Sequence, residues 1–258
     1  MVRAKYTRPL ITKAELKHVR SLQQKKYRES TGLFLVQGPK LVVELLRSER
    51  PVEGLYATVE ARSKYNWRMA TVLPAHELDR LGTLESGVEA IAVVRKLIPE
   101  KFKATRADEL ILVLDGVRDP GNLGTLLRIA DWFGIGRVVC SPDCVEVWNP
   151  KCVQASMGAL FRVEVHALEL APFLVEQERS GTALYIASME GRNVFDVALK
   201  RPAALIMGSE SHGVSDEVRL IRNYLISIPG SGNSESLNVA MAASALCMEF
   251  ARQGRFLT

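Results

Sequence analysis

The sequence predicts an α/β fold in two parts: a small N-terminal α/β domain and a larger C-terminal domain built on a mostly parallel sheet. Three observations predict it. The chain has 258 residues, 47% of them hydrophobic, which suffices for one large or two ordinary domains. Residues 98–108 are polar, charged and interrupted by a proline, which indicates a linker between residues 1–97 and 109–258. After that linker, apolar runs alternate with segments of helical periodicity.

The N-terminal domain mixes helix and strand signals. Apolar residues at a spacing near 3.6 predict a helix over Lys13–Lys26, with basic residues on its other face. Glycines bound a strand-like run from Gly32 to Gly38, and Pro39–Arg47 carries an apolar stripe that predicts a second helix. The later segments GLYATVE, TVLPAHELDRLG and VEAIAVVRK continue the alternation of strands and helices.

The C-terminal domain alternates cleanly between the two signals. Strands are expected at the apolar runs ELILVLDGV, RVVCS, FRVEVH, ALYIASM, AALIMG and YLISIP. Helices are expected at about Leu123 to Phe133, PKCVQASMGAL, Pro172–Arg179, Asp216–Arg222 and Ser236–Gln253. This alternation predicts a mostly parallel sheet with both faces covered. Ligands of such sheets bind at the carboxyl ends of the strands.

Charge is distributed unevenly along the chain. The net charge of +5 combines 21 Lys and Arg against 11 Asp and Glu in residues 1–106 with 13 against 18 in the remainder. A basic surface attracts polyphosphate backbones through counterion release and steering, so we expect the N-terminal part to bind nucleic acid. A solvated basic helix is the plainer explanation of any single charge.

The cysteines do not follow the spacing of a metal site. Cys140, Cys144 and Cys152 lie close together, but they form no CxxC pair and no histidine lies between them. We expect no metal and reduced, mostly structural thiols. No apolar stretch approaches the roughly 20 residues that span a bilayer, and the first residues lack the apolar centre of a secretory signal. We therefore expect a soluble, cytoplasmic protein without membrane association.

Three clusters of glycine and polar residues follow strand-like runs in the C-terminal domain. The first is LDGVRDPGNLGTLLRIADWFG, in which Asn122 can cap the next helix and Arg128 lies six residues later. A turn, a cap and a surface arginine would explain this cluster without any function. A phosphate-binding loop is not favoured, because GxGxxG and GxxxxGK[ST] are both absent there.

The second cluster, LIMGSESHG, also follows a strand. Gly208 and Gly213 permit backbone conformations and close approaches that side chains would forbid. Glu210 could stabilise a helix start or pair with a catalytic cation. His212 could serve as a general base at its ordinary pKa, although a histidine in a loop is more often not catalytic.

The third cluster, ISIPGSGNSESLNVAMAASA, is the most distinctive. A glycine-rich loop precedes Ser236, Leu237 and Asn238, which open a helix of small and apolar residues. A helix so rich in alanine lets another backbone approach closely, either in the core or from a second subunit.

Together the three clusters resemble, in order and residue type, the motifs of the SpoU (TrmH-like) RNA 2′-O-ribose methyltransferases of the SPOUT superfamily. The resemblance implies a methyltransferase domain with a C-terminal trefoil knot, S-adenosylmethionine (S-adenosyl-L-methionine) as cofactor, and a homodimer. It implies RNA as substrate, with ribosomal RNA preferred over transfer RNA. The N-terminal domain resembles the family's small substrate-binding domain, related to ribosomal RNA-binding proteins, most clearly in FLVQGPKLVVELL.

The resemblance also implies site residues. The residues matching the polar positions of the motifs, expected to act in catalysis, are Asn122, Arg128, Glu210, Ser236 and Asn238. The residues whose backbone is expected to hold the cofactor are Gly208, Ile228 and Leu237. Arginine stays protonated, so we expect Arg128 to stabilise developing charge and position phosphate, with Glu210 orienting it. A role of Arg128 as base, assisted by a substrate phosphate, stays open.

The sequence departs from the family pattern at two positions. Ser211 replaces a glycine often found in the second motif, and Gly230 stands where methionine is common. The sequence leaves two other functions as alternatives. A non-catalytic RNA-binding protein on the same scaffold is disfavoured by the intact polar motif residues. A nucleotide-dependent oxidoreductase is disfavoured because the dinucleotide fingerprint is absent.

Overall fold

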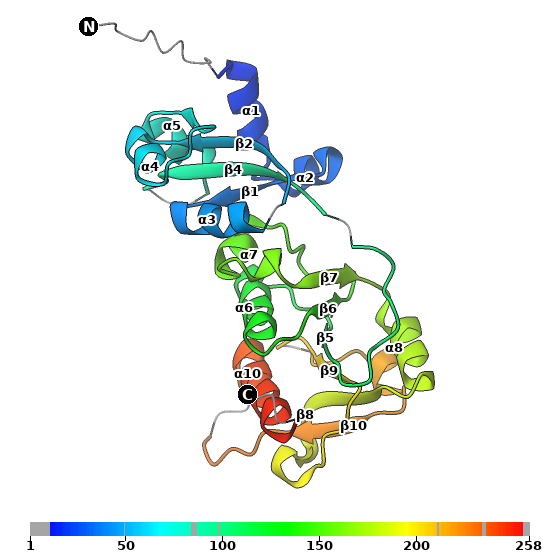
Figure 1. Cartoon of the computed structure of the whole chain (residues 1–258). Helices are drawn as coiled ribbons and strands as arrows, with labels where there is room; N and C mark the ends of the chain where they lie inside the picture. The colour runs from blue at the N-terminus through cyan, green and yellow to red at the C-terminus, as the bar shows by residue number, and fades with distance from the viewer. Residues whose placement is uncertain are drawn as a thin grey trace, which may run out of the picture. The chain divides into compact units, whose positions relative to one another are not determined.

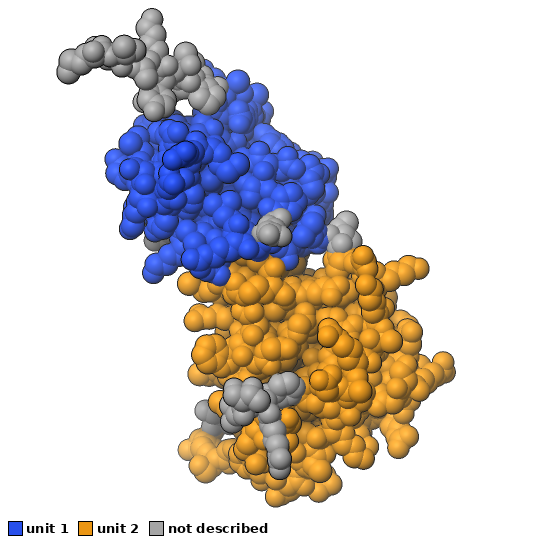
Figure 2. Space-filling model, viewed as in Figure 1, with its two compact units in different colours: residues 1–97, 148–154 blue, residues 98–147, 155–258 orange. Residues whose placement is uncertain are grey.

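The computed structural model describes residues 11–48, 50–83, 87–97, 99–210, 212–233 and 236–254 of the chain. Contacts within the chain divide it into two compact units, residues 1–97 with 148–154 and residues 98–147 with 155–258 (Figure 2). The segment 148–154 therefore belongs to the first unit by its contacts. The expected linker at residues 98–108, and the domain limits drawn from it, stay a prediction.

The first unit is a four-stranded mixed sheet with helices (Figure 1). Its strands are β1 (Leu33–Gln37), β2 (Val52–Ala57), β3 (Thr71–Val72) and β4 (Ala90–Arg95), in the order β1-β4-β2-β3. β4 runs antiparallel to β1 and β2, and β3 runs parallel to β2. Its helices are α1 (Lys13–Ser21), α2 (Lys25–Thr31), α3 (Pro39–Arg47), α4 (Val59–Lys64), α5 (Ala75–Leu81) and most of α7 (Pro150–Ala155). The helix predicted over Pro39–Arg47 is confirmed.

The helix predicted over Lys13–Lys26 is wrong as a single element, because the chain turns between α1 and α2. The buried Arg28 donates hydrogen bonds from Nη1 to the carbonyl oxygens of Leu22 and Gln23, at 2.9 and 2.7 Å. Gln23 Nε2 in turn donates to the carbonyl oxygens of residues 81 and 82, at the end of α5. The turn is thus held by a buried arginine a few residues later and by the end of α5, far away in sequence, and a local spacing rule includes neither.

The second unit holds a six-stranded sheet in the order β10-β8-β9-β5-β6-β7, and all its pairings between described strands are parallel. The strands are β5 (Leu110–Leu114), β6 (Arg137–Cys140), β7 (Glu164–Ala167), β8 (Ala183–Asn193), β9 (Ala203–Met207) and β10 (Tyr224–Ser227). The helices are α6 (Pro120–Trp132), α8 (Leu170–Arg179), α9 (Asp216–Arg219) and α10 (Val239–Gly254), with 3₁₀ turns η1 (Ala159–Phe161) and η2 (Val194–Asp196). Figure 1 shows α6 and α10 on one side of this sheet and α8 on the other.

The two central strands explain why the sheet is parallel and covered. All five residues of β5 and all five of β9 are buried, as expected for continuous apolar runs with both faces covered. On one face, aliphatic side chains pack in a cluster that includes Ile111, Ile206, Leu174 and Val218. The chain leaves β5 toward β6 on one side and returns to β9 on the other. Such a reversal leaves a crevice at the carboxyl ends of the strands.

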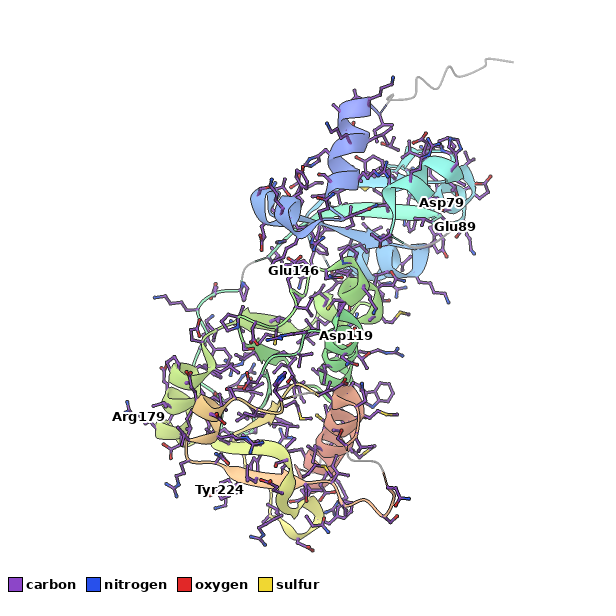
Figure 3. All side chains as sticks on the ribbon, turned by 180° about the vertical axis from the view of Figure 1, so that it is seen from behind. Asp79, Glu89, Asp119, Glu146, Arg179 and Tyr224 are labelled. Atoms are coloured by element: carbon purple, nitrogen blue, oxygen red, sulfur yellow. The ribbon has the colours of Figure 1, made fainter. Side chains whose placement is uncertain are left out.

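α6 and α10, the two helices that border the strand ends discussed below, begin at other residues than expected. α6 begins at Pro120, and Asp119 (labelled in Figure 3) is its N-cap, accepting a hydrogen bond from Asn122 N at 2.8 Å. The expectation that Asn122 caps this helix is therefore wrong. α10 begins at Val239, and Asn238 caps it, with Oδ1 accepting from Ala240 N at 3.0 Å.

β8 carries a bulge where it meets β10. Residues 225 and 226 of β10 pair with residues 186 and 192 of β8, so the chain from 187 to 191 leaves the ladder. Gly191 lets the two strands pass, because a Cβ there would lie 2.5 Å from the backbone of Ile226. The trefoil knot implied by the resemblance stays a prediction.

Candidate active site

Two adjoining cavities open at the carboxyl ends of the strands of the second unit. The larger cavity, of about 650 Å³, is lined by residues from the bulged middle of β8, the ends of β9 and β10, and α10 with the loop before it. The smaller cavity, of about 250 Å³, is lined from the ends of β5 and β9, where the strand order reverses. Ser209, Glu210, Gly213 and Val239 line both cavities and form their shared wall.

The larger cavity gathers the three residues expected to hold a cofactor. Gly208, Ile228 and Leu237 all line it, together with Ser236. Gly208 is required by space, because an added Cβ would lie 2.1 Å from the carbonyl carbon of Gly213. Apolar side chains complete much of the lining, among them Ala187, Met207, Ile226 and Leu246. A cavity of this size and composition suits a cofactor-sized ligand with apolar and polar parts.

Glu210 joins the three sequence clusters in the shared wall. Its Oε1 accepts hydrogen bonds from Asn122 Nδ2 at 3.0 Å and from Asn238 Nδ2 at 2.6 Å. Asn238 Nδ2 also donates to Asn122 Oδ1 at 3.1 Å, which closes a triangle of three side chains. The N-terminus of α10 lies against the same carboxylate and stabilises its negative charge. We call this triangle the asparagine–glutamate junction.

Arg128 lies apart from this junction. It is exposed on α6, lines neither cavity, and its side chain makes no hydrogen bond or ion pair with any residue that the structure describes. Arg128 lies six positions after Asn122 on the helix, which turns it about 240° around the helix axis relative to Asn122. The expectation that Glu210 orients Arg128 is wrong within one chain, because Glu210 binds the two asparagines instead.

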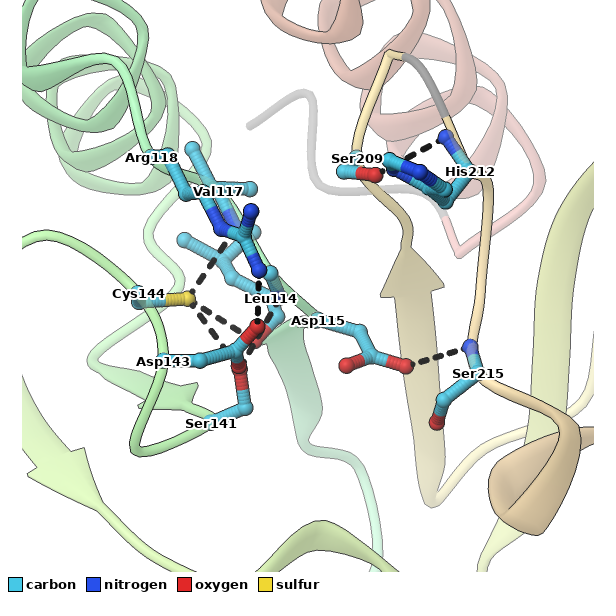
Figure 4. Close-up of polar contacts among 11 residues, drawn as sticks. Leu114, Asp115, Val117, Arg118, Ser141, Asp143, Cys144, Ser209, His212 and Ser215 are labelled. Carbon is cyan, nitrogen blue, oxygen red and sulfur yellow. Dashed lines mark hydrogen bonds and ion pairs between the residues drawn. The ribbon is translucent and has the colours of Figure 1, made fainter.

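The polar lining of the smaller cavity includes residues that the sequence motifs do not single out. Asp115, at the end of β5, is buried, and its Oδ2 accepts a hydrogen bond from Ser215 N at 2.8 Å (Figure 4). Ser141 Oγ donates to Asp143 Oδ1 at 2.5 Å, and Arg118 Nη2 lies 3.4 Å from Asp143 Oδ2. The Ser141 hydrogen bond, and then Arg118, lower the pKa of Asp143 against the opposing effect of burial. Their position in the sequence could have indicated them, because residues 115 and 141–143 directly follow apolar runs that form strands.

Cys144 lies beside Asp143 in the same loop. A hydrogen bond with Cys140, followed in size by bonds with Ser141 and Val117 N, outweighs burial and lowers the pKa of the Cys144 thiol to about 7. Val117 N donates to its sulfur at 3.2 Å, which ties this loop to the end of β5. The thiol thereby helps to hold the wall of the smaller cavity in place.

The other residues that the sequence analysis names lie in the second cluster and in the loop after β10. His212 lines the smaller cavity, and its backbone N donates to Ser209 Oγ at 3.1 Å. Gly230 lines the larger cavity, where no atom lies within 4 Å of an added Cβ. Ser211 lies outside the described residues.

Two family models match the chain. The SpoU rRNA Methylase family matches residues 109–248, and the MRM3-like substrate binding domain matches residues 13–103. The first match covers all three clusters and both cavities. The second covers the helices and strands of the first unit apart from the segment 148–154.

Individual proteins are similar over nearly the whole chain. The 23S rRNA (guanosine(2553)-2′-O)-methyltransferase RlmP of Bacillus subtilis (strain 168) is 29% identical over 90% of this chain and 94% of its own length. The structure of a putative RNA methyltransferase of the TrmH family from Porphyromonas gingivalis is 37% identical, with a TM-score of 0.83, covering 95% of this chain and 99% of that one. The SpoU methyltransferase AviRb from Streptomyces viridochromogenes, solved in complex with the cofactor AdoMet, is 27% identical with a TM-score of 0.84 over the same shares. The predicted α/β fold with a mostly parallel sheet is confirmed.

Proposed function

Because the chain belongs to the SpoU rRNA methylase family, we propose that it transfers a methyl group from S-adenosylmethionine to a ribose 2′-hydroxyl of ribosomal RNA. The asparagine–glutamate junction carries the proposal, because it joins polar residues of all three motifs through Glu210, which lines both cavities. Transfer between two ligands needs adjoining sites, and alignment of the reactants supplies much of the rate. The RlmP relative acts by name on 23S rRNA, which favours ribosomal RNA over transfer RNA.

The residues of the larger cavity fit S-adenosylmethionine. Apolar side chains can cover its base and aliphatic parts, and the backbone at Gly208, Ile228 and Leu237 can bind its polar groups. Bound there, the cofactor supplies an electrophilic methyl group on a positively charged sulfur. The carboxylate of Glu210 in the shared wall attracts positive charge on that side.

The acceptor hydroxyl needs to be held and its developing negative charge balanced. We infer that Asn122 and Asn238, fixed by Glu210, position the ribose by hydrogen bonds, with Ser236 on the cofactor side. Arg128 stays protonated and suits a phosphate or an oxyanion, which its guanidinium binds with two parallel donors. Its exposed position on α6 leaves it open to an approaching RNA or to a second copy of the chain.

An exposed apolar face on α6 and α10 supports a homodimer. Trp132, Met241 and Met248 are 83%, 66% and 60% exposed, on two helices that pack against each other. Water contact with such side chains is unfavourable, and a second copy covering them would remove it. Arg128 lies one turn before Trp132, so this dimer would place Arg128 at the interface.

The first unit is proposed to bind the RNA. It carries most of the excess of basic residues counted over residues 1–106, and residues 13–103 match a substrate binding domain. No helix in the described ranges is long and apolar enough to cross a membrane. We further propose that the protein works in the cytoplasm, as the sequence suggested.

A methylation assay tests the proposal. Ribosomal RNA from cells lacking the protein, incubated with the purified chain and methyl-labelled S-adenosylmethionine, is expected to gain one labelled 2′-O-methylribose. Arg128→Ala should slow this transfer by ~100-fold, the effect of losing one positioned electrostatic group, while calorimetry shows unchanged cofactor binding. If transfer RNA gains the labelled methyl group and ribosomal RNA does not, the substrate is transfer RNA and the proposal of ribosomal RNA is wrong. A fully active Arg128→Ala enzyme would contradict the role of that residue.

A further inference from the structure

Under the proposed function the larger cavity holds the cofactor, which leaves the smaller cavity, on the other side of the shared wall, open to another ligand. Four residues line both spaces, and Glu210 stands between them. A nucleotide whose ribose meets the methyl donor at this wall must place its base close by. The volume of about 250 Å³ is below the ~300–1,000 Å³ typical of sites for drug-sized ligands, so it suits a single base.

The lining of the smaller cavity selects against phosphate. Four carboxylates line it, from Asp115, Asp119, Asp143 and Glu210, against the two basic side chains of Arg118 and His212. Their excess negative charge repels an anion. Among the described residues, no three His, Cys, Asp or Glu side chains converge on a position that could hold a metal ion. With an anion and a metal ion disfavoured, the lining best suits a neutral ligand whose N–H groups donate hydrogen bonds to the carboxylates.

Asp115 gives independent support for such a ligand. The residue is only 7% exposed and lines the cavity. Its Oδ2 accepts from Ser215 N, while its other oxygen has no partner among the described residues (Figure 4). This oxygen is not among the described buried side-chain atoms left without a partner, so water can reach it, and a ligand that displaces that water must supply a donor in its place. A bound N–H group would supply that donor.

Arg118 and Asp143 present an ordered set of donors and acceptors beside Asp115. Their side chains lie 3.4 Å apart and are 74% and 52% exposed, so a ligand can reach both. Gly116 N donates to Ser141 Oγ at 2.9 Å, and Ser141 Oγ donates to Asp143 Oδ1, which fixes the carboxylate from behind. Each carboxylate oxygen keeps a further lone pair for a ligand. The pair therefore offers one donor followed by two acceptors.

We propose that the smaller cavity binds the base of the target nucleotide and selects guanine, with Asp143 accepting from N1–H and the 2-amino group and Arg118 donating to O6. This subsite rests on the proposed function of the adjoining cavity. Cytosine pairs with guanine through the same sequence of one donor and two acceptors. Enzymes that act on an unstacked nucleotide read its base by hydrogen bonds to this edge.

The same array disfavours the other bases. Uracil presents acceptor, donor and acceptor, so one of its carbonyl oxygens would face a carboxylate. Adenine and cytosine each place a ring nitrogen acceptor opposite an Asp143 oxygen. Inosine keeps O6 and N1–H but lacks the 2-amino group. A two-point contact of this kind discriminates between bases by ~10-fold or more.

Binding of single nucleosides tests the subsite without any RNA. The full chain, saturated with S-adenosylhomocysteine, is titrated with guanosine, inosine, uridine, adenosine and cytidine by saturation-transfer NMR. Guanosine should bind ~10-fold more tightly than inosine or uridine. Asp143→Asn replaces one acceptor by a donor, so the preference for guanosine over uridine should fall by ~10-fold or more. Asp196→Asn makes the same change on an exposed residue outside both cavities and should leave the preference intact.

Calorimetry with S-adenosylhomocysteine separates failure of the subsite from failure of the function. Asp143→Asn should keep its affinity for this product within about twofold, as expected of a substitution outside the larger cavity. Equal binding of guanosine and inosine, no nucleoside binding at all, or an unchanged preference in Asp143→Asn overturns the guanine subsite while the methyltransferase proposal stands. Absence of S-adenosylhomocysteine binding to the unaltered chain overturns the proposed function itself.

Discussion

The absence of a side chain at Gly208 allows the path of the loop that lines the larger cavity. The backbone after β9 folds back so closely that a Cβ at this position would lie 2.1 Å from the carbonyl carbon of Gly213. The loop between them carries Ser209 and Glu210 into the shared wall. The position of Glu210 therefore depends on a glycine two residues earlier.

Gly208→Ala is expected to weaken S-adenosylmethionine binding by ~10-fold or more, because the loop must move to admit the methyl group. Isothermal titration calorimetry measures the effect, with circular dichroism to check folding. Gly136→Ala is the matched control, since no atom lies within 4 Å of its added Cβ and its φ is not positive. Equal affinity of the Gly208→Ala variant and the original chain would contradict this account.

Asn238 has two roles that one substitution can separate. It caps α10 through Oδ1 and donates from Nδ2 to Glu210 at 2.6 Å. Asn238→Asp keeps a capping oxygen but sets two carboxylates against each other. We expect methylation to fall by ~100-fold with little loss of thermal stability. Asn193→Asp, at the capping residue of η2 outside both cavities, is the control and should keep full activity.

At the residue scale, the sequence predicts which polar side chains lie near the strand ends, but not the direction in which each of them points. Asn122, Glu210 and Asn238 each follow a strand or open a helix, and carboxyl ends of parallel strands meet at one edge. Their meeting was therefore predictable. The direction of Arg128 was not, because it depends on where α6 begins, and Asp119 rather than Asn122 is its cap. Asp143 escaped notice because its neighbours in space come from the end of β5.

Helices α6 and α10 carry the face on which the proposed homodimer depends. Trp132→Glu is expected to shift the chain toward the monomer, because a charge buried between two apolar helices would lack a partner. Sedimentation velocity over a range of concentrations measures the shift. Leu220→Glu, at a side chain that is 87% exposed near α9, is the control and should leave the assembly unchanged. A monomer in the unaltered chain would remove the proposed interface.

At the element scale, local signals worked where local interactions decide. α3 has the predicted limits because a proline opens it and its apolar stripe faces the core. α1 and α2 were predicted as one helix because their spacing is continuous, whereas the break is held by Arg28 and by the end of α5. α10 begins three residues late because Ser236 and Leu237 line the larger cavity instead.

A group of ionisable side chains on β6, on β7 and directly before β5 couples the stability of the molecule to pH. Burial, together with the nearby Arg137, lowers the pKa of His166 below its usual 6.5, although Glu164 at 3.1 Å raises it. Burial raises the pKa of Glu109, but hydrogen bonds from Arg137 and the backbone of Arg106 outweigh it and lower the pKa overall. The fold thus favours neutral His166 and ionised Glu109.

Stability should fall as the pH drops below about 6.5, because the unfolded chain then binds a proton that the folded His166 resists. A second loss should follow below about 4.5, as Glu109 is protonated. Thermal unfolding at about pH 7.5 and about pH 5.5 measures the first loss. His166→Gln should reduce the difference between the two midpoints, whereas His18→Gln on the exposed face of α1 should not. An unchanged difference in His166→Gln would contradict the assignment.

At the scale of the whole chain, the parallel sheet was predictable and its strand order was not. The buried runs of β5 and β9 show that both faces are covered. That these two strands pair, with Leu110 opposite Ala203, depends on packing between segments far apart in sequence. Residues 148–154 belong to the first unit through contacts with residues far away in sequence. Their own composition does not differ from that of their neighbours, so the sequence does not predict this assignment.

The asparagine–glutamate junction has a consequence for biosynthesis. Asn122 is translated long before Asn238, which stands just ahead of the last described helix, and neither half of the triangle can close alone. Chains emerge from the ribosome amino end first. A nascent polypeptide therefore cannot complete this junction until Asn238 and the start of α10 have been released.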